Sequence, residues 1–339
     1  MYKYNTTENI MKLVILSLIP GVFVQTYYFG YATVIQIVIS VIVGLCTECL
    51  FLCISRRPVL FFIGDYSAIL SAILFSLCLP ILVPWWINVI GSICMIILGK
   101  QLYGGLGQNI FNPAMTGYAI ILVSFPTMMT NWNCLELCIK HCFNFFDVLD
   151  LIFSNKPFFN NLIVDLNNIS VTQATPLNDF KLNQHLSLGT SDISLENIQS
   201  KYIFSVFFWI NFWFLFGGII LLLYKIICWR ISVSFLVSLF ILSLLGSLYY
   251  PNLILSPKIN LFSGATMLGS FFVLTDPVTS PSTNFGKIIF GCLIGFMVWI
   301  IRSFGNYPDS IAFSVLLGNS LVPLIDLLTK SRIYGYKKR

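Results

Sequence analysis

Residues 31–53 read YATVIQIVISVIVGLCTECLFLC, and this stretch decides the fold class. Its one charged side chain is Glu48, and the rest of the run is mostly apolar. A helix needs about 20 mostly apolar residues to cross the hydrocarbon core of a membrane. The stretch therefore predicts a membrane-spanning helix.

The composition of the whole chain agrees with that prediction. The chain has 339 residues, of which 57% are hydrophobic and 9% charged, with a net charge of +6 and a mean hydropathy of +0.87. A soluble domain has roughly 25% charged residues. These values exclude soluble, disordered, collagen-like and coiled-coil proteins and predict extensive contact with membrane lipid. No basic stripe is interleaved with aromatic residues, so we expect no nucleic-acid partner.

Ten apolar segments are long enough to be considered as spans. They predict an all-α polytopic membrane protein with about ten transmembrane helices, at residues 11–29, 31–53, 66–83, 84–100, 113–130, 204–224, 231–250, 262–279, 286–303 and 308–328.

A polar stretch, residues 131–203, separates the fifth segment from the sixth and divides the chain. The first membrane half is 1–130, and the second is 204–339 with a basic tail. Because five is odd, two halves of five spans have opposite orientations. A weak similarity between residues 67–70 and 264–267 favours two inverted five-helix repeats, which often build binding sites from interrupted helices. Chance similarity between apolar segments is the alternative.

The basic residues predict the orientation. With the N-terminus inside, 13 of the 19 Lys and Arg residues fall on inside segments. Only Lys258 and Arg302 lie on short outside connections, where the positive-inside rule applies. Both termini are therefore expected in the cytoplasm, with residues 131–203 on the opposite side of the membrane.

Three polar motifs could carry chemistry. In the outer stretch, Pro176 favours an extended backbone at Thr175, which would project its hydroxyl group. A plain polar loop is the alternative for this motif.

The second motif, residues 100–114, crowds glycines and amides at the inner end of the fourth segment. Glycines allow close backbone approach, and amide side chains can bind a ring edge or a phosphate. The alternative is a re-entrant connection packed against the bundle. The residues concerned are Gly104, Gly105, Gly107, Gln108, Asn109 and Asn112.

The third motif, residues 263–279, ends in Asp276 beside Pro277. An ionisable side chain near the membrane edge is a candidate for an ion path, and the polar end of an interfacial helix is the alternative. The cysteines form no complete metal-binding pattern, so no metal site is expected. Nor is there a catalytic arrangement of the Ser-His-Asp or paired-carboxylate type.

Several long motifs resemble one family. The runs KQLYGGLGQNIFNPAM (100–115), TQATPL (172–177), SGATMLGSFFVLTDPVT (263–279) and IRSFG (301–305) are similar to the D subunits of bacterial Rnf ion-translocating electron-transport complexes. The resemblance covers essentially the whole chain. More distantly, the chain is similar to the B subunit of the sodium-pumping NADH:quinone reductase.

The resemblance implies a subunit of a translocase in the bacterial inner membrane, one that couples electron transfer between NADH and ferredoxin to cation movement. It implies partner subunits A, B, C, E and G, and FMN held by a phosphoester to Thr175 and attached by a flavin transferase on the periplasmic side. The distant relative implies a second, non-covalent flavin, riboflavin, near the 104–112 motif. Flavin-transferase sites usually have an Asp about six residues before the threonine, where this chain has Ile169.

Thr266, in the run SGAT, also resembles a flavin-attachment sequence. It starts an apolar segment, where a phosphate would lose its hydration at a cost of several kcal/mol or more, so Thr175 is the expected site. The alternatives for the whole chain are a passive solute channel or transporter and a packing scaffold.

Overall fold

The computed structural model describes residues 6–130, 132, 145–153, 177, 198–250, 254–305, 307 and 310–330. Every regular element in these ranges is a helix. Seven of the described helices are long and apolar enough to cross a membrane, and α4 and α6 are shorter apolar helices. The prediction of an all-α, multi-pass membrane protein is therefore confirmed.

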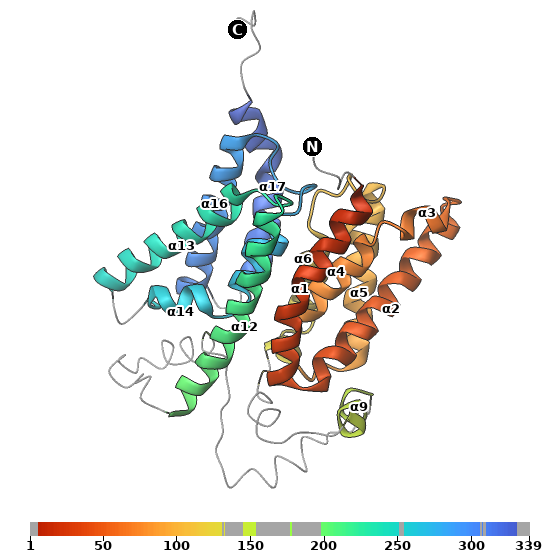
Figure 1. The fold of residues 1–339 in the computed structure, drawn as a ribbon, viewed down its shortest axis with the longest axis horizontal. Helices are drawn as coiled ribbons and strands as arrows, with labels where there is room; N and C mark the ends of the chain where they lie inside the picture. Colours follow the sequence, from red (N-terminus) through yellow and green to blue (C-terminus); the bar gives the residue numbers. More distant parts are fainter. Residues whose placement is uncertain are drawn as a thin grey trace, which may run out of the picture.

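The first membrane half is drawn from red to yellow in Figure 1. Its described helices are α1 (Thr7–Phe29), α2 (Tyr31–Ile54), α3 (Val59–Ile63), α4 (Ser67–Cys78), α5 (Trp85–Gly99), the short η1 (Gln101–Tyr103), α6 (Pro113–Ser124) and α7 (Pro126–Thr130). A further short helix, α9 (Phe145–Phe153), lies beyond them.

The second half is drawn from green to blue in Figure 1. Its described helices are α12 (Ile198–Leu223), α13 (Trp229–Tyr249), α14 (Pro257–Phe262), α15 (Thr266–Leu268), the π-helical η2 (Gly269–Val273), α16 (Asn284–Phe304) and α17 (Ile311–Thr329).

The two halves repeat one pattern of helix contacts. α2 packs against α4 and α5, and α5 against α6; likewise α13 packs against α14 and α16, and α16 against α17. The halves meet where α1 contacts α12 and where α6 contacts α17. Figure 1 shows α1 and α12 running in opposite directions, as inverted repeats require. We call the end where α1 begins and α17 ends the terminal face, and the opposite end the distal face.

The eighth predicted span, residues 262–279, is not one continuous helix. Residues 263–265 break it between α14 and α15, and Gly264 has a φ of 59°, which favours glycine. The buried side chain of Asn211 bonds the interrupted backbone. Its Nδ2 donates to the carbonyls of Phe262 (3.2 Å) and Gly264 (2.9 Å), and its Oδ1 accepts from the N–H of Met267 (3.1 Å). A broken helix is tolerated at membrane depth only where protein groups bond the freed backbone in this way.

Prolines shorten two other predicted spans. α4 ends at Cys78, just before Leu79 and Pro80, so it covers only part of residues 66–83. α6 ends at Ser124, and Pro126 begins the separate helix α7, so residues 113–130 form two helices. A proline disfavours the helical conformation of the residue before it and cannot donate a helical hydrogen bond. The ten apolar segments therefore include seven long helices and three short or interrupted ones.

Small residues let α1 and α12 approach closely where the halves meet. A Cβ atom added to Gly217 would clash with the backbone oxygen of Ser17. A Cβ atom added to Gly21 would clash with the ring of Phe214. Membrane helices commonly pack through such small residues. Contact between the halves therefore depends on these glycines.

We predict that Gly217→Val destabilises the protein by about 1–3 kcal/mol or more, because the blocking atom is backbone and cannot rotate away. Ile219→Val is the matched control, since Ile219 lies on the same helix and is 41% exposed. The measurement is the thermal unfolding midpoint in detergent. Equal midpoints for the two variants would contradict the close approach of α1 and α12.

Candidate cofactor sites

A cavity of about 170 Å³ opens at the terminal face between the two halves; we call it the terminal cavity. Its walls include the apolar side chains of Leu70, Leu74, Phe271 and Phe272. Polar groups from both halves also line it: Ser67, Ser71, Lys100, Asn109, Asn112, Thr275 and Asp276. An apolar pocket with a few convergent polar groups is typical of a cofactor site.

The loop between η1 and α6 forms one side of this cavity. Gly104, Gly105 and Gly107 have φ angles of 113°, 109° and 90°, which side chains rarely adopt. Arg57 fixes the loop from the end of α2, because its Nη1 donates to the carbonyl of Gly104 at 2.6 Å. The glycines therefore shape the turn that brings Leu106 and Asn109 to the cavity.

The two asparagines of the loop differ in what they offer a ligand. Asn112 caps α6: its Oδ1 accepts from the N–H groups of Ala114 (3.1 Å) and Met115 (3.4 Å), and its Nδ2 donates to the carbonyl of Val273 (3.3 Å) in the other half. Asn109 donates from Nδ2 to the carbonyl of Phe111 at 3.2 Å, but its buried Oδ1 has no hydrogen-bond partner among the described residues. Asn109 is thus the amide that can accept a bond from a ligand.

The structure brings only part of the predicted motif to the cavity. Asn109 and Asn112 line it, whereas Gly104, Gly105, Gly107 and Gln108 are not among its lining residues, and Gln108 is exposed. Asp276, which the sequence placed in a separate motif, lines the same cavity. Its carboxylate accepts from the N–H of Val278 (3.2 Å) and the hydroxyl of Thr279 (3.4 Å), so it also holds the turn after η2.

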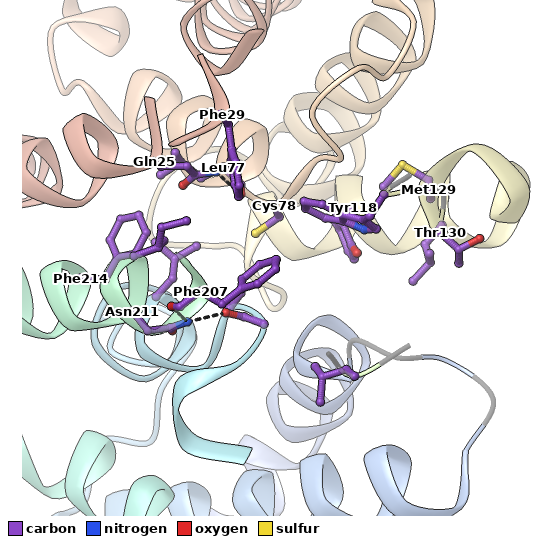
Figure 2. Close-up of a pocket in the computed structure, with 17 residues that line it drawn as sticks. Gln25, Phe29, Leu77, Cys78, Tyr118, Met129, Thr130, Phe207, Asn211 and Phe214 are labelled. Carbon is purple, nitrogen blue, oxygen red and sulfur yellow. Dashed lines mark hydrogen bonds between the residues drawn. The ribbon is translucent and has the colours of Figure 1, made fainter. Parts of the chain in front are cut away.

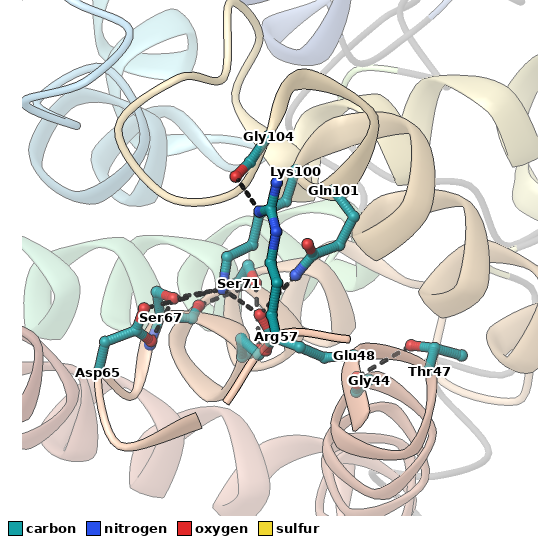
Figure 3. A network of polar contacts seen from close by, with 11 residues as sticks. Gly44, Thr47, Glu48, Arg57, Asp65, Ser67, Ser71, Lys100, Gln101 and Gly104 are labelled. Atoms are coloured by element: carbon teal, nitrogen blue, oxygen red, sulfur yellow. Dashed lines mark hydrogen bonds and ion pairs between the residues drawn. The ribbon is translucent and has the colours of Figure 1, made fainter. Parts of the chain in front are cut away.

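A buried charge network lies beside the cavity (Figure 3), and two of its members, Ser67 and Lys100, line the cavity. The Lys100 ammonium group donates to Glu48 Oε1 at 2.5 Å and to Ser67 Oγ at 2.7 Å. Gln101 Nε2 donates to the same Glu48 oxygen at 2.8 Å, and Asp65 Oδ2 lies 4.0 Å from Lys100 Nζ. In the sequence, Lys100 contributed to the predicted orientation and was the first residue of the 100–114 motif, with no role in ligand binding assigned to it. The isolated charge of Glu48 inside an apolar run was the signal that a buried cation had to lie nearby.

A second cavity, of about 70 Å³, lies at the distal face (Figure 2); we call it the distal cavity. The polar side chains of Gln25 and Asn211 line it. Leu177 also lines it and is buried against Leu255 and Ile259. Five aromatic side chains, those of Phe29, Tyr118, Trp132, Phe207 and Phe214, line it together with aliphatic and small residues. Flat aromatic walls suit a flat aromatic ligand.

Two threonines resemble flavin-attachment sites, and the structure describes one of them. Thr175 lies outside the described residues. Thr266 is fully buried, and its hydroxyl lies 2.8 Å from the carbonyl of Ser263 and accepts from Arg302 Nη2 at 3.0 Å. The Thr266 hydroxyl is therefore part of the helix break and is closed to a modifying enzyme.

Among the described residues, no group of three or more His, Cys, Asp or Glu side chains could hold a metal ion. Cys134, Cys138, Cys142 and His141 lie outside the described residues.

We predict that Glu48→Gln costs about 3–5 kcal/mol of unfolding free energy, because it leaves the Lys100 ammonium group buried without its carboxylate partner. The control is Glu8→Gln, which removes a pair of similar length (2.6 Å to Lys12) that is exposed; exposed pairs contribute about 0–1 kcal/mol. Unfolding midpoints in detergent measure both effects. An unchanged midpoint for Glu48→Gln would show that the pair is not buried as described.

Comparison with known proteins assigns the chain to a family. Residues 1–335 match the model of the NQR2, RnfD, RnfE family. The chain is 44% identical over 336 residues to a protein of Aliivibrio salmonicida named as the D subunit of the ion-translocating oxidoreductase complex, with 98% of this chain and 95% of the relative covered. Proteins of the same name from Psychromonas ingrahamii (46% identity, 98% and 96% covered) and Buchnera aphidicola (44%, 99% and 97%) are similar to it. The chain belongs to the NQR2, RnfD, RnfE family.

Proposed function

We propose that this chain is the D-type membrane subunit of an ion-translocating oxidoreductase complex, and that it relays electrons through bound flavins while the complex moves cations. The observation that carries the proposal is the full-length similarity to proteins of that name. The two cavities support a relay, because they lie at opposite faces of the bundle and have apolar walls with a few polar groups. The coupling would link electron transfer between NADH and ferredoxin to cation movement.

One flavin is FMN, joined by a phosphoester to Thr175. Leu177 supports this assignment, because it is buried at the edge of the distal cavity and lies two residues further along the chain. Two residues of extended chain span at most about 7 Å. A ring attached at position 175 is therefore within reach of the aromatic walls formed by Phe29, Phe207 and Phe214. The FMN would supply reversible electron uptake, and these residues would hold its ring away from water.

The second flavin is non-covalent riboflavin in the terminal cavity. The unpartnered Oδ1 of Asn109 supports a flavin at this place. A buried acceptor needs a hydrogen-bond donor, and the imide N–H of a flavin ring is such a donor. Phe271 and Phe272 would contact the ring faces. Asp276 lines the same cavity, so we assign it to the path by which a cation or proton approaches.

The terminal face would lie in the cytoplasm of a bacterial inner membrane. Lys12, Arg57, Lys100 and Lys287 belong to segments at this face, which agrees with the positive-inside rule. Residues 131–203 would then face the periplasm, where a flavin transferase can reach Thr175. The partners would be subunits A, B, C, E and G of the complex.

We predict that Thr175→Ala abolishes covalent FMN, because it removes the hydroxyl that forms the phosphoester. Thr266→Ala is the matched control and should keep the flavin, since its hydroxyl is buried in the helix break. Flavin fluorescence of the denatured chain in a gel measures both. A fluorescent Thr175→Ala band beside a dark Thr266→Ala band would move the attachment site to Thr266. A wild-type chain that carries no flavin but conducts solute in proteoliposomes would favour the passive channel.

The orientation predicts which engineered cysteines react from outside the cell. In a chain with Cys134, Cys138 and Cys142 replaced by serine, Asn183→Cys should react with a membrane-impermeant maleimide in cells whose outer membrane is permeabilised. Lys338→Cys should react only after the inner membrane is opened. The opposite labelling pattern would contradict the proposed orientation of the chain in the membrane.

A further inference from the structure

We propose that Lys100 is the charged ligand-binding group of the terminal cavity, positioned by Glu48 and Ser67, and that it stabilises the negative charge that a flavin ring gains on reduction. This inference rests on the non-covalent flavin proposed above. It adds a residue that acts on the reduction potential of the flavin ring, whereas the apolar side chains of the cavity act on how the ring fits.

The hydrogen bonds of Lys100 leave one N–H group for a ligand. An ammonium group has three donors. Two of them are used by Glu48 Oε1 and Ser67 Oγ, and Asp65 Oδ2 at 4.0 Å is too distant for a hydrogen bond. No other acceptor of Lys100 is found among the described residues. Because the side chain is only 3% exposed and lines the cavity, the third N–H can be satisfied by a molecule bound there.

The position of the cation is fixed before any ligand binds. Glu48 is buried on α2, and Gln101 Nε2 holds the same Glu48 oxygen that Lys100 bonds. Ser67 begins α4, so the ammonium group is held by two helices at once. A charge that is already in place needs no reorganisation when charge develops nearby, and a water-poor site strengthens its effect.

The second half contains an equivalent cation at the other face. Arg302, near the end of α16, donates from Nη2 to Thr266, the first residue of α15, at 3.0 Å. Lys100, at the end of α5, donates to Ser67, the first residue of α4, at 2.7 Å. The inverted repeat thus builds the same cation–hydroxyl pair twice. Arg302 does not line the terminal cavity, so it provides a matched control for the loss of a buried cation.

The charge of the ring gives Lys100 its role. Addition of two electrons and one proton to an isoalloxazine ring leaves one negative charge on it, and the redox partners in the complex would supply the electrons. A fixed cation beside the ring binds the reduced form more tightly than the oxidised form. The reduction potential of the flavin therefore rises with the charge at position 100.

The experiment is a redox titration of the non-covalent flavin in the purified complex, with Thr175→Ala present so that covalent FMN does not contribute. The double variant Glu48→Leu, Lys100→Met removes both charges of the pair, which avoids leaving one buried charge unpaired. Lys100→Arg keeps the charge, and Arg302→Met removes the equivalent cation at the distal face.

In the double variant we expect the affinity for reduced flavin to fall at least tenfold more than the affinity for oxidised flavin. This change corresponds to a reduction potential that is more negative by about 30 mV or more. Loss of the flavin from the double variant, with retention in Arg302→Met, would also support direct binding. Lys100→Arg and Arg302→Met should keep the original potential. Equal potentials and flavin contents in all variants, or equal changes in the double variant and Arg302→Met, would overturn the role of Lys100. A parent complex without non-covalent flavin would instead contradict the proposed second flavin.

Discussion

Polar groups inside the bundle need a partner within the protein or in a molecule bound to it, because the hydrocarbon around the bundle offers none. This constraint explains the structure at the places where the spans are interrupted. Asn211 bonds the backbone at the break before α15, and Asn112 joins the start of α6 to the carbonyl of Val273 in the other half. Lys100, which lines the terminal cavity, is paired with the buried Glu48. The polar residues that permit the interruptions are thus also those that surround the cavities.

The interrupted spans link the two cavities. α4 contributes Ser67 and Leu70 to the terminal cavity and Leu77 and Cys78 to the distal one. Residues 264–272 of the second half run antiparallel to α4. They contribute Gly264, Ala265 and Leu268 to the distal cavity, and Phe271 and Phe272 to the terminal cavity. A cavity at each face therefore follows from the inverted repeat, and the same pair of segments connects the two cavities. This arrangement agrees with the proposed electron relay across the membrane part of the complex.

The sequence predicted the membrane class, because an apolar run such as residues 31–53 has few other interpretations. It did not predict that residues 262–279 form a broken helix, since the partner that permits the break, Asn211, is distant in sequence and comes from α12. The glycines at 104, 105 and 107 were interpreted as permitting positive φ angles and close approach to a ligand. The structure shows the positive φ angles, in a turn that presents Asn109. The pairing of Lys100 with Glu48 was not predicted, because the two residues lie 52 positions apart in the chain and only the fold brings them together.

The claim that the chain carries two flavins, one covalent and one not, is tested most directly by mass spectrometry of the purified wild-type chain after denaturation. We expect a chain heavier by one esterified FMN, with the added mass on the peptide that contains Thr175, and about one riboflavin per chain released into solution. An unmodified chain mass with no released flavin would contradict the claim.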